Sequence, residues 1–182
     1  MEQLRLFFAI DLPEYLKELL LEQAQSDNKN IWRWTSKTNL HLTLEFLGSI
    51  KKEDLAKIIK AGEQSHQEIH PFKIKIKYLC LGPEEKITKR MIWAVLEAPE
   101  LLTKLKKSLR NNLIKEGINF QIEKQEFHPH ITIARLKQGE MNPSYKYQKE
   151  LIAEFEVKEF LLIKSELKSS GPQYSVVQSF TL

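Results

Sequence analysis

The protein contains 182 residues, with 28 Lys and Arg against 24 Asp and Glu and a formal net charge of +4. Its longest uninterrupted apolar run covers residues 91–96, whereas a transmembrane helix needs about 20 residues, so no membrane span is expected. The single cysteine excludes an internal disulfide, and the first residues lack the basic start and the long apolar stretch of a secretory signal. A cytoplasmic protein is therefore expected.

The length is typical of one compact domain, and we expect residues 1–182 to form a single domain. The mild excess of positive charge favours an anionic partner without identifying it. Pro and Gly number only 7 and 6, so long flexible linkers are not expected.

The first half of the chain is predicted to mix strands and helices. Short apolar and aromatic runs predict strands, and Leu and Ile spaced three or four residues apart predict helices. In chain order we expect a strand at 5–10, a helix that begins near Glu14, a strand at 40–47, a helix at 51–62, and strands at 72–78 and 91–96.

The second half continues with a long helix over 99–117, which a glycine terminates, and a strand over 128–136. Residues 158–167 and 174–182 are expected to form an antiparallel pair around the Ser-Ser-Gly-Pro turn at 169–172. Several strands follow one another directly, which does not fit a purely alternating parallel fold. The sequence therefore predicts an α+β architecture with antiparallel sheets.

Two tetrapeptides repeat the formula His-apolar-Thr-apolar, one beginning at His41 and the other at His130. The chain has only five His, so this repetition is not expected by chance. On a strand, residues i and i+2 share a face, so His41 lies beside Thr43 and His130 beside Thr132. Two such strands that face each other enclose a small space with two imidazoles and two hydroxyls, which suits a phosphate.

Hydrolysis of a phosphodiester without a metal needs one group that removes a proton from water and another that protonates the leaving oxygen. Histidine suits both tasks because its ordinary pKa of about 6.5 allows one copy to be neutral while the other is charged. The Thr hydroxyls can donate hydrogen bonds to the non-bridging oxygens. The sequence therefore predicts catalysis by a pair of histidines.

These motifs and their surroundings resemble the 2H phosphoesterase superfamily, in its branch of RNA 2′,3′-cyclic phosphodiesterases, also called 2′-5′ RNA ligases. The similarity extends over nearly the whole chain. It rests on RLFFAI at 5–10, NLHLTLEFLG at 39–48, FHPHITIAR at 127–135 and SELKSSGPQY at 165–174.

The resemblance implies a bilobal fold with pseudo-twofold symmetry. Two antiparallel sheets with helices on the outside would flank a central cleft, in two intertwined lobes that each carry one motif. It also implies a monomer that needs no cofactor or metal.

The implied activity opens a 2′,3′-cyclic phosphate at an RNA end, or on a nucleotide, to a 2′-phosphate, with reverse 2′-5′ ligation as a side activity. His41 would be the general acid and His130 the general base. Thr43 and Thr132 would hold the phosphoryl oxygens, and Arg135 would contact the phosphate. The alternation of side chains along a strand opposes this last role. His130 and Thr132 share one face, and Arg135 should point to the opposite face.

Other interpretations remain open for the site as a whole. A module could bind nucleotides or RNA ends in the same cleft without turnover, or the enzyme could act on a small cyclic nucleotide. The pairs His66 with His70 and His128 with His130 have spacings that a metal could use, although no thiolate cluster accompanies them.

Several single residues also have two interpretations. The lysines at 73, 75 and 77 could follow an RNA backbone, although a solvated strand face is the simpler explanation. Cys80 is expected to be a buried, inert thiol. One of four aromatic residues near the motifs could stack on a terminal base: Trp32, Trp34, Phe127 and Tyr174.

Overall fold

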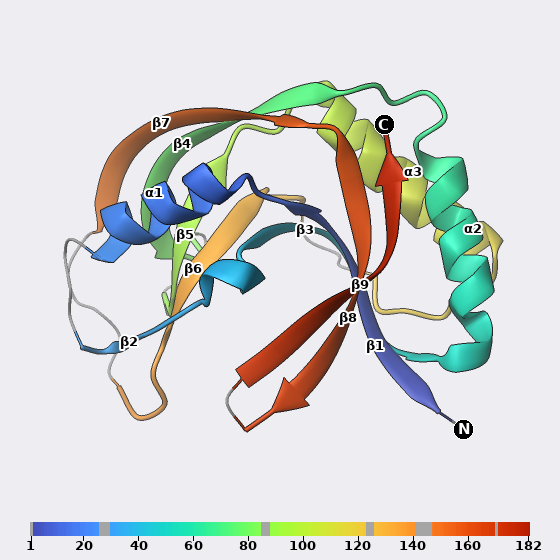
Figure 1. The fold of residues 1–182 in the computed structure, drawn as a ribbon. Coiled ribbons are helices and arrows are strands. Elements are labelled where there is room, and N and C mark those ends of the chain that lie inside the picture. Colours follow the sequence, from blue (N-terminus) through green and yellow to red (C-terminus); the bar gives the residue numbers. More distant parts are fainter. Residues whose placement is uncertain (1, 26–29, 85–87, 123–125, 141–146, 170) are drawn as a thin grey trace.

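The computed structural model describes the whole chain except residues 1, 26–29, 85–87, 123–125, 141–146 and 170 (Figure 1). The strands are β1 Gln3–Asp11, β2 Trp32–Trp34, β3 His41–Lys51, β4 Phe72–Gly82, β5 Met91–Leu96, β6 His130–Leu136, β7 Gln148–Val157, β8 Glu159–Lys168 and β9 Gly171–Thr181. The helices are α1 Glu14–Gln25, α2 Leu55–Ser65 and α3 Glu100–Lys115, with short 3-10 turns η1 Lys37–Asn39 and η2 Lys52–Asp54. None of the helices in this part of the chain has the length and apolar character that membrane crossing requires.

The strands and helices predicted from the sequence are all present, with bounds that differ by a few residues. Two strands, β2 and β7, were not predicted. The Glu and Lys in β7 are typical of helices, but this segment pairs with β4 and places Glu154 and Glu156 opposite Lys75 and Lys73. Lys73 Nζ also lies 2.7 Å from Glu154 Oε1. The lysine stripe therefore faces carboxylates across the strand pair, which favours the solvated-face interpretation.

The strands form one antiparallel sheet in the order β7-β4-β5-β6-β3-β1-β8-β9, with β2 paired to β6. The α+β prediction is confirmed, but the two expected sheets are joined into one. The register between β3 and β6 consists of a single residue pair, Leu42 opposite Ile131. The sheet thus has two halves that meet at this junction, β6-β5-β4-β7 with β2 on one side and β3-β1-β8-β9 on the other.

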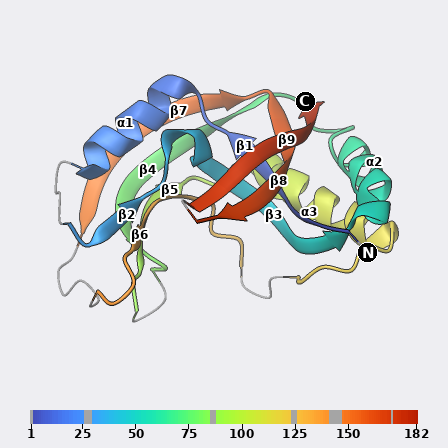
Figure 2. The same ribbon diagram turned by 60° about the horizontal axis from the view of Figure 1, so that its bottom comes forward.

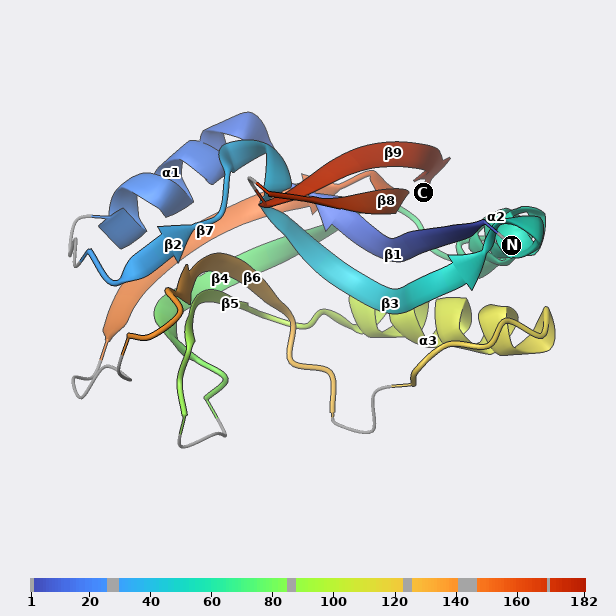
Figure 3. The same cartoon turned by 90° about the horizontal axis from the view of Figure 1, so that it is seen from below.

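The helices cross between the halves. Helix α1 follows β1 but contacts β6, and the Tyr15 hydroxyl donates to the carbonyl of Glu154 on β7 at 3.0 Å. Helix α3 follows β5 but packs on α2 and β3. Figures 1 and 3 accordingly show α1 at one end of the molecule and α2 with α3 at the other. Each half is covered by a helix whose preceding strand belongs to the other half.

The main hydrophobic core contains the apolar sides of all three helices together with Leu42 and Ile131 at the junction, which are 1% and 0% exposed. A smaller cluster, to which Tyr174 adds its ring, is formed by Phe7, Ala9, Leu161 and Ile163. Figure 2 shows the β8–β9 hairpin lying in front of β1 and β3, with the end of β8 and the start of β9 near the middle of the molecule. The junction therefore has one buried face, and the site residues lie on the other.

Candidate active site

The two His-apolar-Thr-apolar motifs meet at the junction of β3 and β6. Because the strands are antiparallel and Leu42 lies opposite Ile131, a local twofold axis passes through this pair and relates one motif to the other. Continuing the register places His41 beside Thr132 and Thr43 beside His130. These four side chains are partly exposed, whereas Leu42 and Ile131 are buried. The fold thus brings both imidazoles and both hydroxyls to one face, although the motifs are far apart in the chain.

A β-bulge follows the threonine of each motif. In β3, Ala9 lies opposite Thr43 and Phe8 opposite Glu45, so Leu44 is the extra residue. In β6, Ile133 is the extra residue in the same motif position, between the partners of Trp93 and Ile92. A bulge puts two residues opposite one and shifts the side-chain alternation by one position.

The second bulge explains how Arg135 can lie on the same face as His130 and Thr132, which regular alternation along a strand would not allow. After Ile133, the register pairs Arg135 with Met91 and Thr132 with Trp93. Met91 and Trp93 share a face of β5, so Arg135 returns to the face of His130 and Thr132. Its side chain is exposed. The equivalent residue after the first bulge is Phe46, which is also exposed, at 38%.

Backbone carbonyls orient both imidazoles in the same way. Nδ1 of His41 lies 2.7 Å from the carbonyl oxygen of Asn39, and Nδ1 of His130 lies 2.8 Å from that of His128. A carbonyl only accepts hydrogen bonds, so Nδ1 carries a proton in each ring and Nε2 is the nitrogen that gains or loses one. Nε2 of His41 lies 3.0 Å from the Thr43 hydroxyl oxygen.

Aromatic rings pack against both imidazoles. The Trp93 indole is stacked on His130 with centroids 3.7 Å apart and planes 18° apart. His41 contacts Phe7 at 4.9 Å and Tyr174 edge-on at 5.5 Å. Tyr174 is the member of the four aromatic candidates that reaches a motif histidine, whereas Trp32 is buried in the core and Trp34 and Phe127 pack against it.

Trp93 was not identified from the sequence, because it lies 37 residues before His130 and only the pairing of β5 with β6 brings them together. Gly82 on β4 allows the indole to lie flat on the strand. A Cβ at Gly82 would lie 2.2 Å from Cδ2 of Trp93. The indole is thus held between the β4 backbone and the His130 ring and fixes the plane of that ring.

The electrostatic surroundings of His41 favour its neutral form. Burial lowers the pKa of His41, and the positive charges of Arg135 and His130 lower it further. The Asn39 carbonyl and the carboxylate of Asp11 partly oppose this shift. Arg135 and His130 can act on His41 because all three lie on the same face of the junction.

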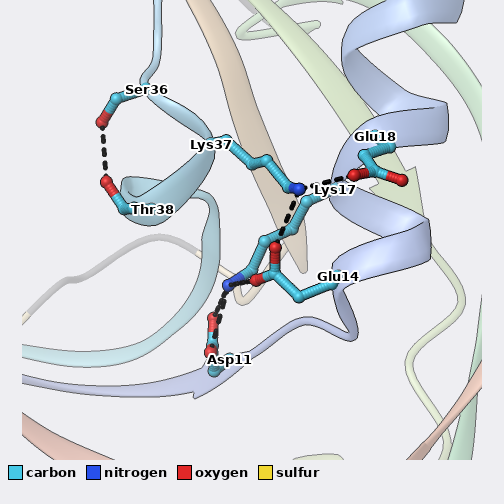
Figure 4. A network of polar contacts seen from close by, with 7 residues as sticks. All are labelled: Asp11, Glu14, Lys17, Glu18, Ser36, Lys37 and Thr38. Atoms are coloured by element: carbon cyan, nitrogen blue, oxygen red, sulfur yellow. Dashed lines mark hydrogen bonds and ion pairs between the residues drawn. The ribbon is translucent and has the colours of Figure 1, made fainter.

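A network of charged side chains holds Asp11, whose carboxylate acts on His41 (Figure 4). Lys17 is 5% exposed and lies 2.9 Å from an oxygen of Asp11 and 3.1 Å from one of Glu14. Lys37 in η1 binds Glu14 at 2.9 Å and Glu18 at 2.6 Å. The network ties η1, which leads directly into β3, to helix α1.

A second contact secures the start of β3 to the β8–β9 hairpin. The side-chain amide of Asn39 donates to the carbonyl of Pro172 at 2.8 Å. The main-chain carbonyl of Asn39 is the acceptor for His41. Both the side chain and the carbonyl of Asn39 are therefore fixed. The backbone that orients His41 is therefore held by α1 and by the hairpin.

Three other titratable candidates, His66, His70 and Cys80, have no part in this arrangement. Helix α2 ends at Ser65, so His66 and His70 do not form the helical pair that a metal could use. The His66 ring instead packs near Phe160, with centroids 5.9 Å apart. Cys80 is buried, and burial raises the pKa of its thiol to about 12, which agrees with an inert residue.

The chain is similar to several known proteins. A family profile described as LigT like Phosphoesterase matches residues 10–93 and 95–174. The RNA 2′,3′-cyclic phosphodiesterase of Methanocaldococcus jannaschii is 33% identical over 97% of this chain and 100% of the relative. The protein of the same name from Aquifex aeolicus is 35% identical over 88% of this chain and 87% of the relative.

Solved structures are also similar. A crystal structure of a Thermus thermophilus protein superposes with a TM-score of 0.85 at 31% identity and covers 98% of this chain and 97% of its own. E. coli LigT complexed with 3′-AMP superposes with a TM-score of 0.77 at 25% identity and covers 100% of this chain and 99% of its own.

Proposed function

The chain belongs to the LigT-like phosphoesterase family, and we propose that it is an enzyme that hydrolyses the 2′,3′-cyclic phosphate at an RNA end to a 2′-phosphomonoester. The names of relatives that match nearly the whole chain support this substrate class. The observation that carries the proposal is the β3–β6 junction, where two imidazoles with carbonyl-bound Nδ1 atoms share one partly exposed face. A pure binding site would not need two titratable nitrogens held in this way.

The proposed reaction uses the two Nε2 atoms on opposite sides of one phosphorus. His130 takes a proton from water as the water oxygen bonds to phosphorus, and His41 gives a proton to O3′ as the P–O3′ bond breaks. Each transfer contributes roughly 10² to 10⁴-fold to the rate. Thr43 and Thr132 donate to the non-bridging oxygens, and Arg135 balances their charge. This arrangement needs no metal or cofactor. A 5′-hydroxyl that attacks the phosphorus in place of water would join two ends through a 2′-5′ bond.

His41 must be protonated to act as the acid, and the bound substrate helps to achieve this. Its pKa lies below the ordinary value of 6.5 because of burial and of the charges of Arg135 and His130. A phosphodiester anion beside His41 favours the imidazolium and compensates for those positive charges. We therefore expect the pKa of His41 to rise when the substrate binds.

This difference predicts a specific pH dependence. The protonated fraction of His41 in the free enzyme falls as pH rises through its lowered pKa, so kcat/KM should decline from below about pH 6.5. The alkaline decline of kcat, which reports the enzyme–substrate complex, should lie at higher pH. Steady-state kinetics from about pH 4.5 to about pH 9 measure both.

The substitution Asp11→Asn removes a charge that raises the pKa of His41 and should move the decline of kcat/KM to lower pH. If kcat and kcat/KM declined at the same alkaline pH, the assignment of His41 as the general acid would be contradicted.

The proposed function is tested with an oligonucleotide that ends in a 2′,3′-cyclic phosphate, incubated with the enzyme in excess EDTA. We expect full conversion to the 2′-phosphate, identified by chromatography against both isomers. Dependence on added divalent metal would contradict the two-histidine mechanism. A 3′-phosphate product would show that O2′ is the leaving oxygen in place of O3′. Tight binding without turnover would favour a binding module. Rates on 2′,3′-cyclic mononucleotides, compared with the oligonucleotide, test the small-substrate alternative.

Trp93 is expected to act as a positioning residue for His130. Replacing the indole, Trp93→Leu, removes the stacking surface that fixes the imidazole plane, and we expect kcat to fall roughly tenfold per folded molecule. Trp93→Phe keeps a flat ring and should recover most of this loss. Circular dichroism confirms the folded fraction of each variant. Equal kcat for the Leu and Phe variants would show that the stacking has no positioning role.

The remaining expectations from the sequence concern the whole protein. We propose that residues 1–182 form one domain of two intertwined lobes that acts as a monomer in the cytoplasm on RNA ends or nucleotides. Size-exclusion chromatography with light scattering tests the monomer.

A further inference from the structure

Strand β2 places a second arginine beside Arg135. The register of β2 with β6 pairs Arg33 with Arg135, and the neighbouring pair, Trp32 with Leu136, is buried. Residues directly opposite each other on paired strands point to the same face of the sheet, so Arg33 and Arg135 share the face that lies away from the buried pair. Both arginines are exposed. The face that carries the motif histidines therefore also carries two adjacent guanidinium groups.

The charges of this arginine pair are not balanced by carboxylates. Within the described part of the chain, neither Arg33 nor Arg135 forms an ion pair, and Arg135 Nη1 contacts the sulfur of Met91 at 3.0 Å. Partial burial lowers the pKa of Arg135, Tyr174 opposes this shift, and the positive charge of Arg33 lowers it further. Like charges directly opposite each other on paired strands destabilise the sheet. An anionic ligand that lies between the two guanidinium groups relieves this repulsion.

The positive charge continues beyond the end of β6. Lys137 follows Arg135 by two residues and thus has the same place in the alternation, and its backbone N–H donates to the carbonyl of Ile31 at 2.9 Å. Its ammonium donates to the backbone and side-chain oxygens of Asn30 at 2.7 and 2.8 Å, which are neutral acceptors. Arg135, Arg33 and Lys137 form a cationic row that begins beside the motifs and leads away from the junction.

The pairing of the strands places Arg33 on the same side of β6 as His41. Strands β3 and β5 both pair with Ile131 and therefore occupy the two edges of β6. Strand β5 also pairs with Arg135, so β2 pairs with Arg135 along the edge that β3 uses. In the proposed reaction His41 protonates the leaving O3′. Arg33 therefore lies on the side of the leaving group, and the water enters on the side of His130.

The chemistry of an RNA end places an anion on this side. The leaving O3′ belongs to the terminal ribose, so this ribose lies on the side of His41. In an RNA, the 5′ oxygen of the same ribose carries the phosphodiester that joins it to the preceding nucleotide. A 2′,3′-cyclic mononucleoside lacks this phosphodiester. A guanidinium binds the non-bridging oxygens of a phosphate through two parallel hydrogen bonds, so Arg33 has the charge and the donor geometry that this phosphodiester requires.

We propose that Arg33 binds the phosphodiester directly 5′ of the terminal nucleoside and thereby makes the enzyme prefer RNA ends to cyclic mononucleotides. This inference rests on the proposed function and names a specificity-determining residue for it. Arg135 contacts the phosphate that reacts, whereas Arg33 contacts a phosphate that does not react. Binding by Arg33 is therefore equally strong in the ground state and in the transition state, so its loss should raise KM and leave kcat nearly unchanged.

The test compares three substrates. They are adenosine 2′,3′-cyclic phosphate, adenylyl-adenosine with a 2′,3′-cyclic phosphate end, and the same dinucleotide with an uncharged methylphosphonate linkage. The methylphosphonate keeps both nucleosides and removes only the charge of the internal linkage. For the unsubstituted enzyme, kcat/KM for the charged dinucleotide should be at least about tenfold above the values for the other two substrates. Equal kcat/KM for the charged and the uncharged dinucleotide would overturn the proposal.

The variant Arg33→Gln assigns the effect to this residue. It should raise KM for the charged dinucleotide roughly tenfold and change kcat/KM for the other two substrates less than about twofold. The slope of log kcat/KM against log salt for the charged dinucleotide should become shallower by about 0.7, the value for one phosphate contact on a single strand. Lys107→Gln, at an exposed position on α3, removes the same charge outside the site and should change none of these values.

The contradicting outcomes are distinct. A loss of hydrolysis in Arg33→Gln that is equal for the three substrates would indicate a structural role and would overturn the proposal, as would an unchanged KM for the charged dinucleotide. Failure of the unsubstituted enzyme to hydrolyse any of the three substrates would instead refute the proposed function, and the subsite with it. Hydrolysis of all three at equal kcat/KM would refute the subsite alone.

Discussion

Replacing either motif histidine, in the variants His41→Ala and His130→Ala, is expected to lower kcat for hydrolysis of the cyclic phosphate by at least about 10²-fold. The variants lose the proton donor or the proton acceptor at one side of the phosphorus, and no neighbouring group occupies the same position. Each imidazole is partly exposed, and its Nδ1 bonds a backbone carbonyl. The free energy of unfolding should therefore change by no more than about 1 kcal/mol.

The double variant sharpens this prediction. Acid and base act in the same transition state, so removing both should cost little more than removing one. His70→Ala is the matched control, because His70 is exposed and lies outside the site, and its kcat should equal that of the unsubstituted protein. Rates come from product formation under saturating substrate, and unfolding free energies come from urea titration. A single variant that keeps more than a tenth of the original kcat would refute the role of that histidine.

Replacing Glu45 by alanine is expected to cost about 3 kcal/mol of unfolding free energy, the largest effect we predict on stability. Glu45 follows the bulge of the first motif and is 1% exposed. Its carboxylate accepts from Arg110 Nε at 2.9 Å and from a terminal nitrogen of the same guanidinium at 3.1 Å, and Lys106 Nζ lies at 3.7 Å. Glu45→Ala leaves two cations of α3 near the core without their countercharge.

The same cluster links stability to the geometry of the site. The Lys106 ammonium donates to the carbonyl of Leu44, the bulged residue, and lies 4.4 Å from the centroid of the Phe127 ring. Disturbing this cluster should therefore loosen the bulge that follows Thr43 and should lower kcat as well as stability. Urea titration gives the free energy, and kcat at a temperature where the variant is fully folded isolates the second effect.

An exposed ion pair provides the matched control for Glu45. Lys104 Nζ lies 2.7 Å from Glu100 Oε1, but these side chains are 59% and 80% exposed. Glu100→Ala should leave the free energy of unfolding almost unchanged, since water solvates the remaining lysine. Similar losses for Glu45→Ala and Glu100→Ala would mean that burial of Glu45 adds nothing to its ion pair.

The sequence by itself determined the elements that depend on local patterns. Alternation in residues 40–47 and 128–136 predicted the two strands that carry the motifs, and the spacing of His and Thr placed an imidazole beside a hydroxyl on each. Leu and Ile spaced at helical intervals predicted all three helices. These features follow from periodicities of about 2 and about 3.6 residues, which a single segment expresses before it packs against anything.

The tertiary structure decided which segments meet. The bulge at Ile133 returns Arg135 to the face of His130, but a bulge is a mismatch between two paired strands and has no counterpart in the pattern of β6 alone. Stacking of Trp93 on His130 likewise depends on the register of β5 with β6 and on the bare backbone of Gly82. The residues of β7 have a composition typical of a helix, but they form a strand because they pair with the edge of β4. In each case the deciding interaction joins residues distant in the chain, and local propensity is too weak to specify it.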